Sequence, residues 1–324
     1  QNYIADVYEA QPEPLPNNTR PTTRWYQFKI PIKNPDKVVG NISGFNSIRF
    51  MRVFMRDFNE PIICRLATFE LGKSDWRTYS LDLMEDGDYL PANGGEGTNF
   101  TVSSVSFEEN GNRTPINYVL PPGIEREQGY GSTTLYYVNE QALTMKVQNL
   151  SDGDARAIYK TTNYDLRKFK RLKMFIHAEK INAGDNIHKG DVTTFIRLGS
   201  DFTDNYYEYE IPVEMSPWGV NDSSSVWPLA NRMEIILDSL VSVKQMRNKE
   251  VRNGSHPSIA VPYSVEIGGN KITVVGTPNL SDVATIMIGI RNPKKKTIND
   301  ATKAKADELS ACKTQEEYKT WVKN

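Results

Sequence analysis

The chain has 324 residues, which is enough for about two domains. Charged residues make up 24% of it and the hydrophobic set 38%, an ordinary composition for a globular protein. The 39 Lys and Arg residues are balanced by 40 Asp and Glu residues, which argues against a nucleic-acid binder with a concentrated basic surface. No apolar run approaches the roughly 20 residues of a membrane-spanning helix.

Strand patterns dominate the chain. Short alternating runs rich in Tyr, Phe, Val and Ile are bounded by Gly, Pro, Asn and Asp, as in β-strands. Residues 268–271 predict a hairpin turn, because Gly268 and Gly269 accept positive φ. Many short strands without intervening amphipathic helices favour an antiparallel sandwich or barrel. The predicted strands are 25–32, 48–56, 62–71, 101–107, 142–148, 155–160, 171–179, 192–198, 206–213, 232–238, 262–267, 271–276 and 284–290.

Irregular composition suggests where domains divide. Residues 118–134 are rich in Pro and Gly and lack periodicity, so they predict a linker. We therefore expect a first β-sandwich at 1–117 and a second at 135–293. The expected fold is mainly β, with tandem jelly-roll-like antiparallel sandwiches followed by a short helical hairpin at 294–324.

The C-terminal segment has the most helical composition. Asp300 can cap a first helix, and Thr314 with Glu317 forms a capping box for a second. The two cysteines, Cys64 and Cys312, are too few for a metal cluster, and their spacing predicts no disulfide, although a bridge stays open as an alternative. The start at Gln1 suggests a mature fragment or an excised segment.

Two strands share a pattern. "WYQFKIPI" at 25–32 and "YYEYEIPV" at 206–213 each carry an apolar stripe with period two. Each is followed later by an apolar strand ending in Arg, and 50–56 aligns with 285–291 without a gap. This predicts a duplicated sandwich whose inner stripe is buried and whose outer face is solvated. The inner positions include Tyr26, Phe28, Tyr207 and Tyr209.

Glu208 and Glu210 share the outer face, about 7 Å apart along the strand. A retaining glycosidase needs two carboxyl groups about 5–5.5 Å apart. The other copy has Gln27 and Lys29 at the matching positions, so a solvated strand face is the favoured interpretation.

Other catalytic or metal-binding patterns are weak. Asp152 and Asp154 flank a Gly, but Asn163 stands where an EF-hand has Glu, so a turn is favoured and structural calcium stays open. His177 is expected to point outward from its strand, while His188 and His256 fall in loops. The sequence has no nucleophile elbow, P-loop or dinucleotide fingerprint. We therefore expect neither an enzyme nor a cofactor.

Four aromatic residues are candidates for contact with a ligand or partner. Trp218 and Trp227 flank a polar loop, as in carbohydrate-binding sandwiches, while Trp25 and Tyr206 occupy the polar faces of their strands.

Several long strings resemble the SprA/Sov family. They are "RFMRVFMRDFNEPIICRLATFELGKSDWR" (49–77), "LSDGDARAIYKTTNYDLRKFKRLKMFIHAE" (150–179), "FIRLGSDFTDNYYEYEIPV" (195–213) and "TPNLSDVATIMIGIRNP" (277–293). The resemblance covers most of 23–293. Members of this family are giant outer-membrane translocons of the Bacteroidota type IX secretion system, linked in some members to gliding motility.

The resemblance implies a non-catalytic cap or vestibule segment inserted into a large translocon barrel. Its implied partners are the rest of that barrel, other type IX components and secreted cargo, with membrane contact only through the parent barrel. The extracellular face of the outer membrane is favoured because long insertions in such barrels lie on that side, with the periplasmic face as the alternative. A carbohydrate-binding cell-surface module is the alternative function.

Overall fold

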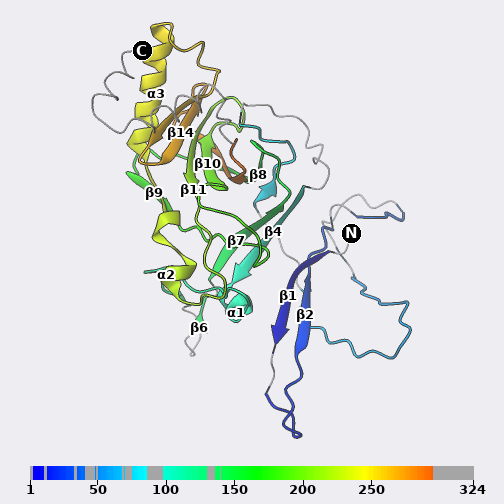
Figure 1. Ribbon diagram of the computed structural model, residues 1–324. Helices are drawn as coiled ribbons and strands as arrows, with labels where there is room; N and C mark the ends of the chain where they lie inside the picture. The colour runs from blue at the N-terminus through cyan, green and yellow to red at the C-terminus, as the bar shows by residue number, and fades with distance from the viewer. Residues whose placement is uncertain are drawn as a thin grey trace, which may run out of the picture. The chain divides into compact units, whose positions relative to one another are not determined.

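The computed structural model describes residues 3–10, 13–32, 35–40, 48, 50–67, 69, 75–85, 98–129, 136–138 and 140–294 (Figure 1). The chain forms two compact units, Gln1–Asp75 and Trp76–Asn324. Both contain antiparallel sheets, and helices are few, so the predicted mainly β class is confirmed.

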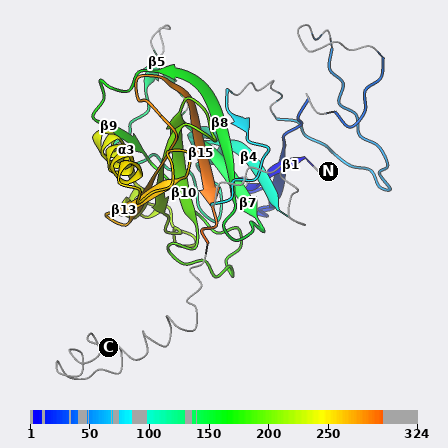
Figure 2. The same ribbon diagram turned by 90° about the horizontal axis from the view of Figure 1, so that it is seen from above.

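A seven-stranded antiparallel sheet forms the centre of the unit Trp76–Asn324, with strand order β13-β14-β11-β10-β15-β8-β3. All of its strands except β3 lie close to the predicted ranges, and Gly268 and Gly269 form the predicted β13–β14 turn with positive φ. Figure 2 shows β15 between β8 and β10. The strand bounds are β3 Arg77–Thr78, β8 Ala155–Tyr164, β10 Thr193–Gly199, β11 Tyr206–Pro212, β13 Tyr263–Ile267, β14 Asn270–Val275 and β15 Val283–Arg291.

One face of this sheet carries the main hydrophobic core. Alternate residues of β10, β11 and β14 point into it, and α3 (Leu237–Arg252) packs against it together with the two-stranded ladder of β9 (Arg171–Met174) and β12 (Met233–Ile236). Figure 2 shows α3 lying along this side of the sheet. The predicted burial of Tyr207 and Tyr209 is confirmed. The core includes Ile196, Leu198, Tyr207, Tyr209, Ile211, Met233, Ile235, Leu240, Val243, Ile272 and Val274.

The helix α3 was not predicted. Its buried residues Leu237, Leu240, Val243 and Arg247 follow helical spacing. The strand expected at 232–238 ends at Ile236, where the helix begins. The start of the helix is rich in Val, Leu and Ser, which are compatible with a strand, so the sequence pattern is ambiguous there.

Polar side chains tie α3 and β11 to the segments before β13 and after β14. Arg247 is buried, and its Nη1 donates to the carbonyl oxygens of Gly276 (2.7 Å) and Ile259 (3.2 Å). Lys244 Nζ and the Tyr207 hydroxyl donate to the carbonyl oxygen of Pro278, at 2.7 and 3.2 Å. Burial raises the pKa of Tyr207 to about 12, although Arg247 partly opposes the shift.

We expect Tyr207 to make the fold sensitive to alkali. The pKa of Tyr207 in the folded protein lies above its value of about 10 in the unfolded chain. Its contribution to the free energy of unfolding is therefore complete below pH 10 and is lost as the pH rises toward 12. The expected loss is about 2–3 kcal/mol. Urea unfolding at several pH values should show a smaller loss over this interval for Tyr207→Phe than for the wild type. Tyr164→Phe, at an exposed position, is the matched control, and equal pH dependence in Tyr207→Phe and the wild type would refute the assignment.

The opposite face of the sheet has its own apolar cluster. Phe195 and Met287 pack with Tyr79 and Leu83, from the segment that follows β3. Gly289 permits this packing, because a Cβ at that position would lie 2.3 Å from Cζ of Phe195. This second face is therefore covered rather than solvated.

The residues before β8 also pack within this unit. β4 (Asn99–Ser106) pairs along its whole length with β7 (Gln141–Gln148), and short strands β5 (Gln128–Gly129) and β6 (Tyr136–Tyr137) pair with each other. β4 belongs to the expected first sandwich and β7 to the second, so this pairing crosses the expected boundary. The observed units instead meet between Asp75 and Trp76.

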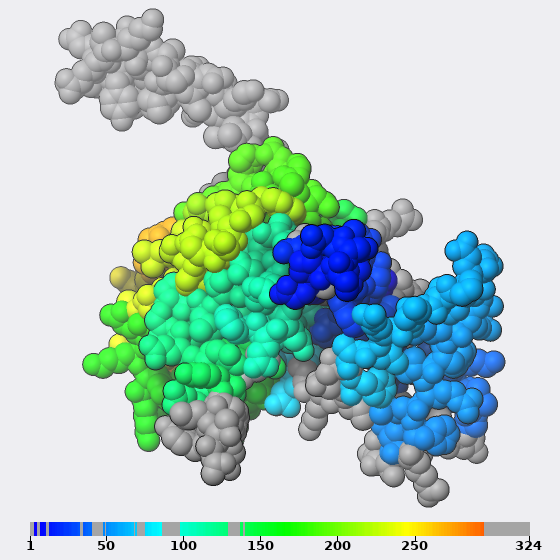
Figure 3. Space-filling model, turned by 90° about the horizontal axis from the view of Figure 1, so that it is seen from below, coloured from blue at the N-terminus to red at the C-terminus, as the bar shows by residue number. Residues whose placement is uncertain are grey.

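The expected linker at 118–134 is packed over its first residues. Trp227 Nε1 donates to the carbonyl oxygen of Val119 (2.8 Å), and Ser223 Oγ donates to that of Leu120 (2.7 Å). Figure 3 shows the teal segment, which includes the start of the expected linker, against the yellow-green chain around α2. The first residues of the expected linker therefore lie against the segment that contains α2. The short helices are α1 Phe107–Asn110, α2 Ser223–Val226 and the 3₁₀ turn Leu229–Asn231.

The unit Gln1–Asp75 contains one two-stranded sheet among its described residues, formed by β1 (Ile4–Ala10) and β2 (Thr23–Phe28). Tyr26 and Phe28 are 48% and 59% exposed, so the predicted burial of this stripe is wrong. Residues 50–67 contain no strand, although strands were predicted there. The apolar stripe of β11 is thus buried, whereas the matching stripe of β2 is exposed. The reason is that only β11 has a neighbouring strand on both sides and α3 packed over its face.

The predicted helical hairpin lies outside the described residues except for Lys294. In the described ranges, no helix combines the length and apolar character needed to cross a bilayer.

Candidate functional site

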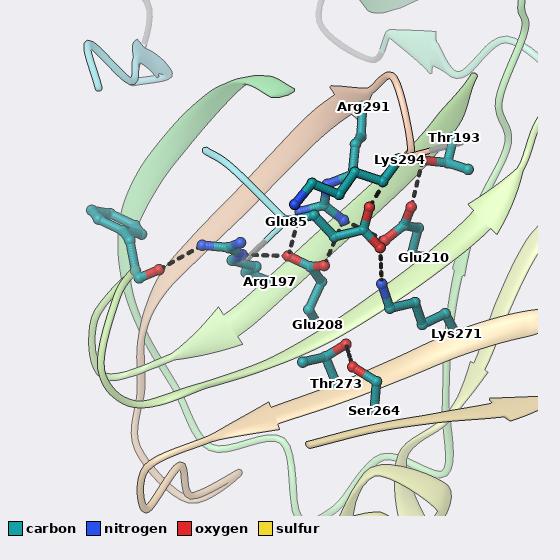
Figure 4. Close-up of polar contacts among 11 residues, drawn as sticks. Glu85, Thr193, Arg197, Glu208, Glu210, Ser264, Lys271, Thr273, Arg291 and Lys294 are labelled. Atoms are coloured by element: carbon teal, nitrogen blue, oxygen red, sulfur yellow. Dashed lines mark hydrogen bonds and ion pairs between the residues drawn. The ribbon is translucent and has the colours of Figure 1, made fainter. Parts of the chain in front are cut away.

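Four charged side chains lie together on the sheet face opposite α3 (Figure 4). Arg197 comes from β10, Glu208 and Glu210 from β11, and Arg291 from β15. The strand register places Arg197 directly opposite Glu208, and Thr193 opposite Arg291. All four are almost fully buried, which is unusual for charged residues unless they are paired. We call these four residues the charge network.

Within the charge network, each carboxylate contacts an arginine. Arg291 Nη1 donates to Glu208 Oε1 (2.8 Å) and also to Glu210 Oε2. Arg197 Nε donates to the other oxygen of Glu208, and its Nη1 donates to the carbonyl oxygen of Phe202 (2.8 Å). Thr193 Oγ1 donates to Glu210 Oε1 (2.5 Å). Two positive and two negative charges therefore neutralise each other inside the protein.

Aromatic rings complete the surroundings of both arginines. The guanidinium carbon of Arg291 lies 4.5 Å from the ring centre of Phe195, and that of Arg197 lies 4.2 Å from the ring centre of Tyr206. Planar guanidinium groups pack well against aromatic faces while their edges bind carboxylates. This explains why these positions carry arginine.

Glu85 lies near the charge network and binds three other segments. Its carboxylate accepts hydrogen bonds from Lys271 Nζ (2.5 Å) and from the backbone nitrogen of Lys294 (3.0 Å), and its own nitrogen donates to the carbonyl oxygen of Gly153 (2.8 Å). Figure 4 shows Glu85 beside Lys271 and Lys294 at the edge of the network. The segment after β3, the start of β14 and the exit from β15 are thereby held together.

Burial and charge act in opposite directions on the two carboxylates. Burial alone would raise the pKa of Glu208, but Arg197 and Arg291 outweigh it and hold that pKa far below the ordinary value. Burial raises the pKa of Glu210 above its ordinary value, and the charge of Glu208 adds to this shift while Arg291 opposes it. Burial would lower the pKa of Arg291, but the two glutamates outweigh it and raise that pKa.

The expected solvated position of the glutamates is wrong, since Glu208 is 3% exposed and Glu210 4%. Alternation in a strand reveals which residues share a face, but not whether a distant segment covers that face. The arginines that pair with them lie on β10 and β15, and no local motif links these positions. The network is enclosed and neutralised, which suits a structural connection better than contact with a substrate.

Asp154, one of the two aspartates considered for calcium, and Asp201, in a later turn, both bind protein groups. Asp154 is buried, accepts hydrogen bonds from the nitrogens of Leu83 (3.1 Å) and Ala155 (2.7 Å), and pairs with Arg156 (2.5 Å). Asp201 accepts hydrogen bonds from the backbone of its own turn. Within the described ranges, no group of three or more His, Cys, Asp or Glu residues could hold a metal ion.

His177 lies inside a polar cluster, so its predicted outward orientation is wrong. Its Nδ1 is 2.7 Å from the carbonyl oxygen of Val226, and its Nε2 is 3.3 Å from Glu179 Oε2. Glu179 also pairs with Arg113, and Ser216 Oγ lies 3.2 Å from Nδ1.

Ser216, His177 and Glu179 therefore form a line that resembles a catalytic triad. The carbonyl oxygen of Val226 is the nearest neighbour of Nδ1, and a carbonyl can only accept. We therefore assign a proton to Nδ1, which prevents this nitrogen from taking the serine proton. The line instead anchors α2 to the segment after β9.

The structure separates the four candidate aromatic residues. Trp227 is buried, with its ring edge-on to Tyr118, and Tyr206 is buried beneath Arg197. Trp25 is half-buried on β2, opposite Tyr8. Trp218 is 47% exposed and lines a surface pocket. Of the two tryptophans that flank the polar loop, Trp227 is therefore packed inside the protein and Trp218 is accessible.

Comparison with protein-family models shows which family the chain is related to. The model of the SprA_N family, described as motility related/secretion protein, matches residues 1–324. The chain belongs to the SprA_N family. The resemblance to SprA/Sov proteins is thus confirmed. No curated protein sequence matches the chain.

Membership in the SprA_N family associates the chain with secretion and motility. The match covers both compact units, including the sparsely paired one at Gln1–Asp75. The charge network and the His177 cluster are therefore features of a SprA_N chain. Both consist of interactions that join separate segments of the polypeptide.

Proposed function

We propose that this chain is a non-catalytic, cofactor-independent segment of a type IX secretion translocon in the outer membrane of a Bacteroidota cell. It shapes the cap or vestibule of the translocon and offers docking surface during export of folded proteins. Its partners are the rest of the translocon, other components of the secretion system and the cargo. The extracellular face is the favoured location, and the periplasmic face is the alternative.

The enclosure of the charge network is the observation that carries this proposal. Glu208 and Glu210 are the carboxylates that the sequence offers for acid–base chemistry, yet Arg197 and Arg291 neutralise them away from solvent. A general acid or base must reach the proton that it transfers. Charges placed in this way favour one arrangement of the sheet, and a rigid sheet suits a cap or vestibule.

Removing the described part of the larger compact unit tests the proposed role. Deletion of 76–294 in the parent translocon removes every strand of the seven-stranded sheet. A shorter deletion that begins between β4 and β7 would leave β4 without its pairing partner. We expect cargo to accumulate in the periplasm while the shortened parent protein still reaches the outer membrane, measured by immunoblots of cell fractions and medium.

A point variant provides a matched comparison. Lys173→Ala, at a half-exposed position on β9, should secrete normally. Arg291→Met, which keeps the chain length but disrupts the charge network, should reduce secretion. Normal secretion by the deletion would refute the proposed role. Secretion loss with equal loss of the parent protein from the membrane would indicate a role in folding or insertion instead.

A further inference from the structure

A surface pocket of about 340 Å³ opens at one end of the β10–β11 hairpin. Thr193 at the start of β10 lies opposite Pro212 at the end of β11, so the segment before β10 and the segment after β11 leave the sheet side by side. These two segments form the pocket walls. The lining residues are Lys180, Ala183, Ile187, Lys189, Glu214, Met215, Ser216, Pro217 and Trp218.

Hydrogen bonds hold the walls in place. The nitrogen of Ser216 donates to the carbonyl oxygen of Ala178 (2.8 Å), which joins one wall to the other. The buried side chain of Asn231 accepts from the nitrogen of Glu214 and donates to its carbonyl oxygen, both at 2.7 Å. Ser216 Oγ also donates to the carbonyl oxygen of Val226 (3.1 Å). A pocket fixed in this way binds a ligand without a large ordering cost.

The lining combines an apolar surface with an excess of positive charge. Its apolar part comes from Trp218, Ile187, Met215 and Pro217, all of which line the pocket. Lys189 lies 3.7 Å from Glu214, so these two charges offset each other. Among the residues that the structure describes, Lys180 has no ion-pair partner. The lining therefore contains one ammonium group without an ion-pair partner and one half-exposed aromatic residue.

We propose that this pocket binds an anionic sugar, one uronic-acid residue of a surface polysaccharide. The apolar C–H face of the sugar ring packs on Trp218, and the carboxylate binds the ammonium group of Lys180. The volume lies near the lower end of the roughly 300–1,000 Å³ range of small-molecule pockets, which suits one sugar ring better than a folded peptide. This site is independent of the secretion role, because binding requires only the chain itself.

Binding can be measured by titrating the full chain with trigalacturonate, using isothermal calorimetry and tryptophan fluorescence. The fully methyl-esterified trisaccharide is the matched neutral probe. We expect the acid to bind at least about tenfold more tightly than the ester, the size of effect that a hydrogen bond to a charged group produces. Higher salt should weaken binding of the acid and leave the ester unaffected.

Two variants test the assigned contacts. Trp218→Ala and Lys180→Ala should each weaken binding of the acid about tenfold or more, and Lys180→Ala should remove the preference over the ester. Phe169→Ala removes an exposed aromatic outside the pocket and should change nothing. Circular dichroism checks that each variant is folded.

Several results would overturn the proposal. One is that the chain does not bind trigalacturonate at millimolar concentration. Another is that it binds the acid and the ester with equal affinity. A third is that folded Trp218→Ala binds the acid as tightly as the wild type. Binding of an acidic peptide such as hexaglutamate, with the same dependence on Trp218 but without uronate binding, would reassign the pocket to a protein partner. None of these outcomes depends on secretion, so failure here and failure of the translocon role are distinguishable.

Discussion

Replacing Arg291 by Met should cost about 3–5 kcal/mol in the free energy of unfolding, because it leaves buried carboxylates without their shared counter-charge. Arg291 forms ion pairs with both Glu208 and Glu210, while Arg197 forms one with Glu208. Methionine fills a similar space, so the loss reflects charge more than volume. Guanidinium chloride unfolding of the full chain, followed by circular dichroism, measures the change.

Two further variants separate burial from charge. Arg167→Met removes an arginine whose side chain is 67% exposed and pairs with Asp165, so it should cost less than about 1 kcal/mol. Adding Glu210→Gln to Arg291→Met leaves Glu208 with Arg197 as a balanced pair and should recover part of the loss. If Arg291→Met cost no more than Arg167→Met, the charge network would be irrelevant to stability.

Removing residues 1–75 should leave cooperative unfolding of the remaining chain intact and should lower binding of the dye ANS several-fold. The sheet, α3 and the charge network all belong to the unit Trp76–Asn324. The removed unit has a two-stranded sheet, and such a sheet alone is marginally stable in water. Its described part also exposes many large apolar side chains, including Phe50, Phe54, Ile63, Leu66 and Phe69.

Thermal unfolding and ANS fluorescence at equal molar concentration compare the full and shortened chains. Contiguous exposed apolar surface is uncommon on free globular proteins and is the kind of surface that binds ANS. The shortened chain carrying Arg291→Met is the control, since partial unfolding should restore dye binding. Loss of cooperative unfolding in the shortened chain would show that residues 1–75 are part of the fold of the larger unit.

Strand positions in the larger unit followed from the sequence, because alternation is a local property. The hairpin at Gly268 and Gly269 was predictable for the same reason, as two adjacent glycines permit the turn that joins β13 and β14. The helix α3 was not predictable in this way, because its few apolar residues fit both the period of a helix and that of a strand. The same limit applies at 50–67, where a strand-like pattern has no described neighbouring strand to pair with.

The candidate sites depended more on the fold. Tyr206, Glu208 and Glu210 were placed correctly on one face of their strand, but their burial depends on Arg197, Arg291 and segments distant in the sequence. Trp218 and Trp227 lie nine positions apart, yet one lines a pocket and the other packs against Tyr118.

The sequence by itself determined the β class, most strands of the larger unit and membership in the family, because these rest on residue type and short-range spacing. Only the tertiary structure decided which strand faces are covered, which charges meet and which aromatic residues remain accessible. Those properties arise when strands far apart in the chain become neighbours, and no local pattern encodes which neighbour each strand will have.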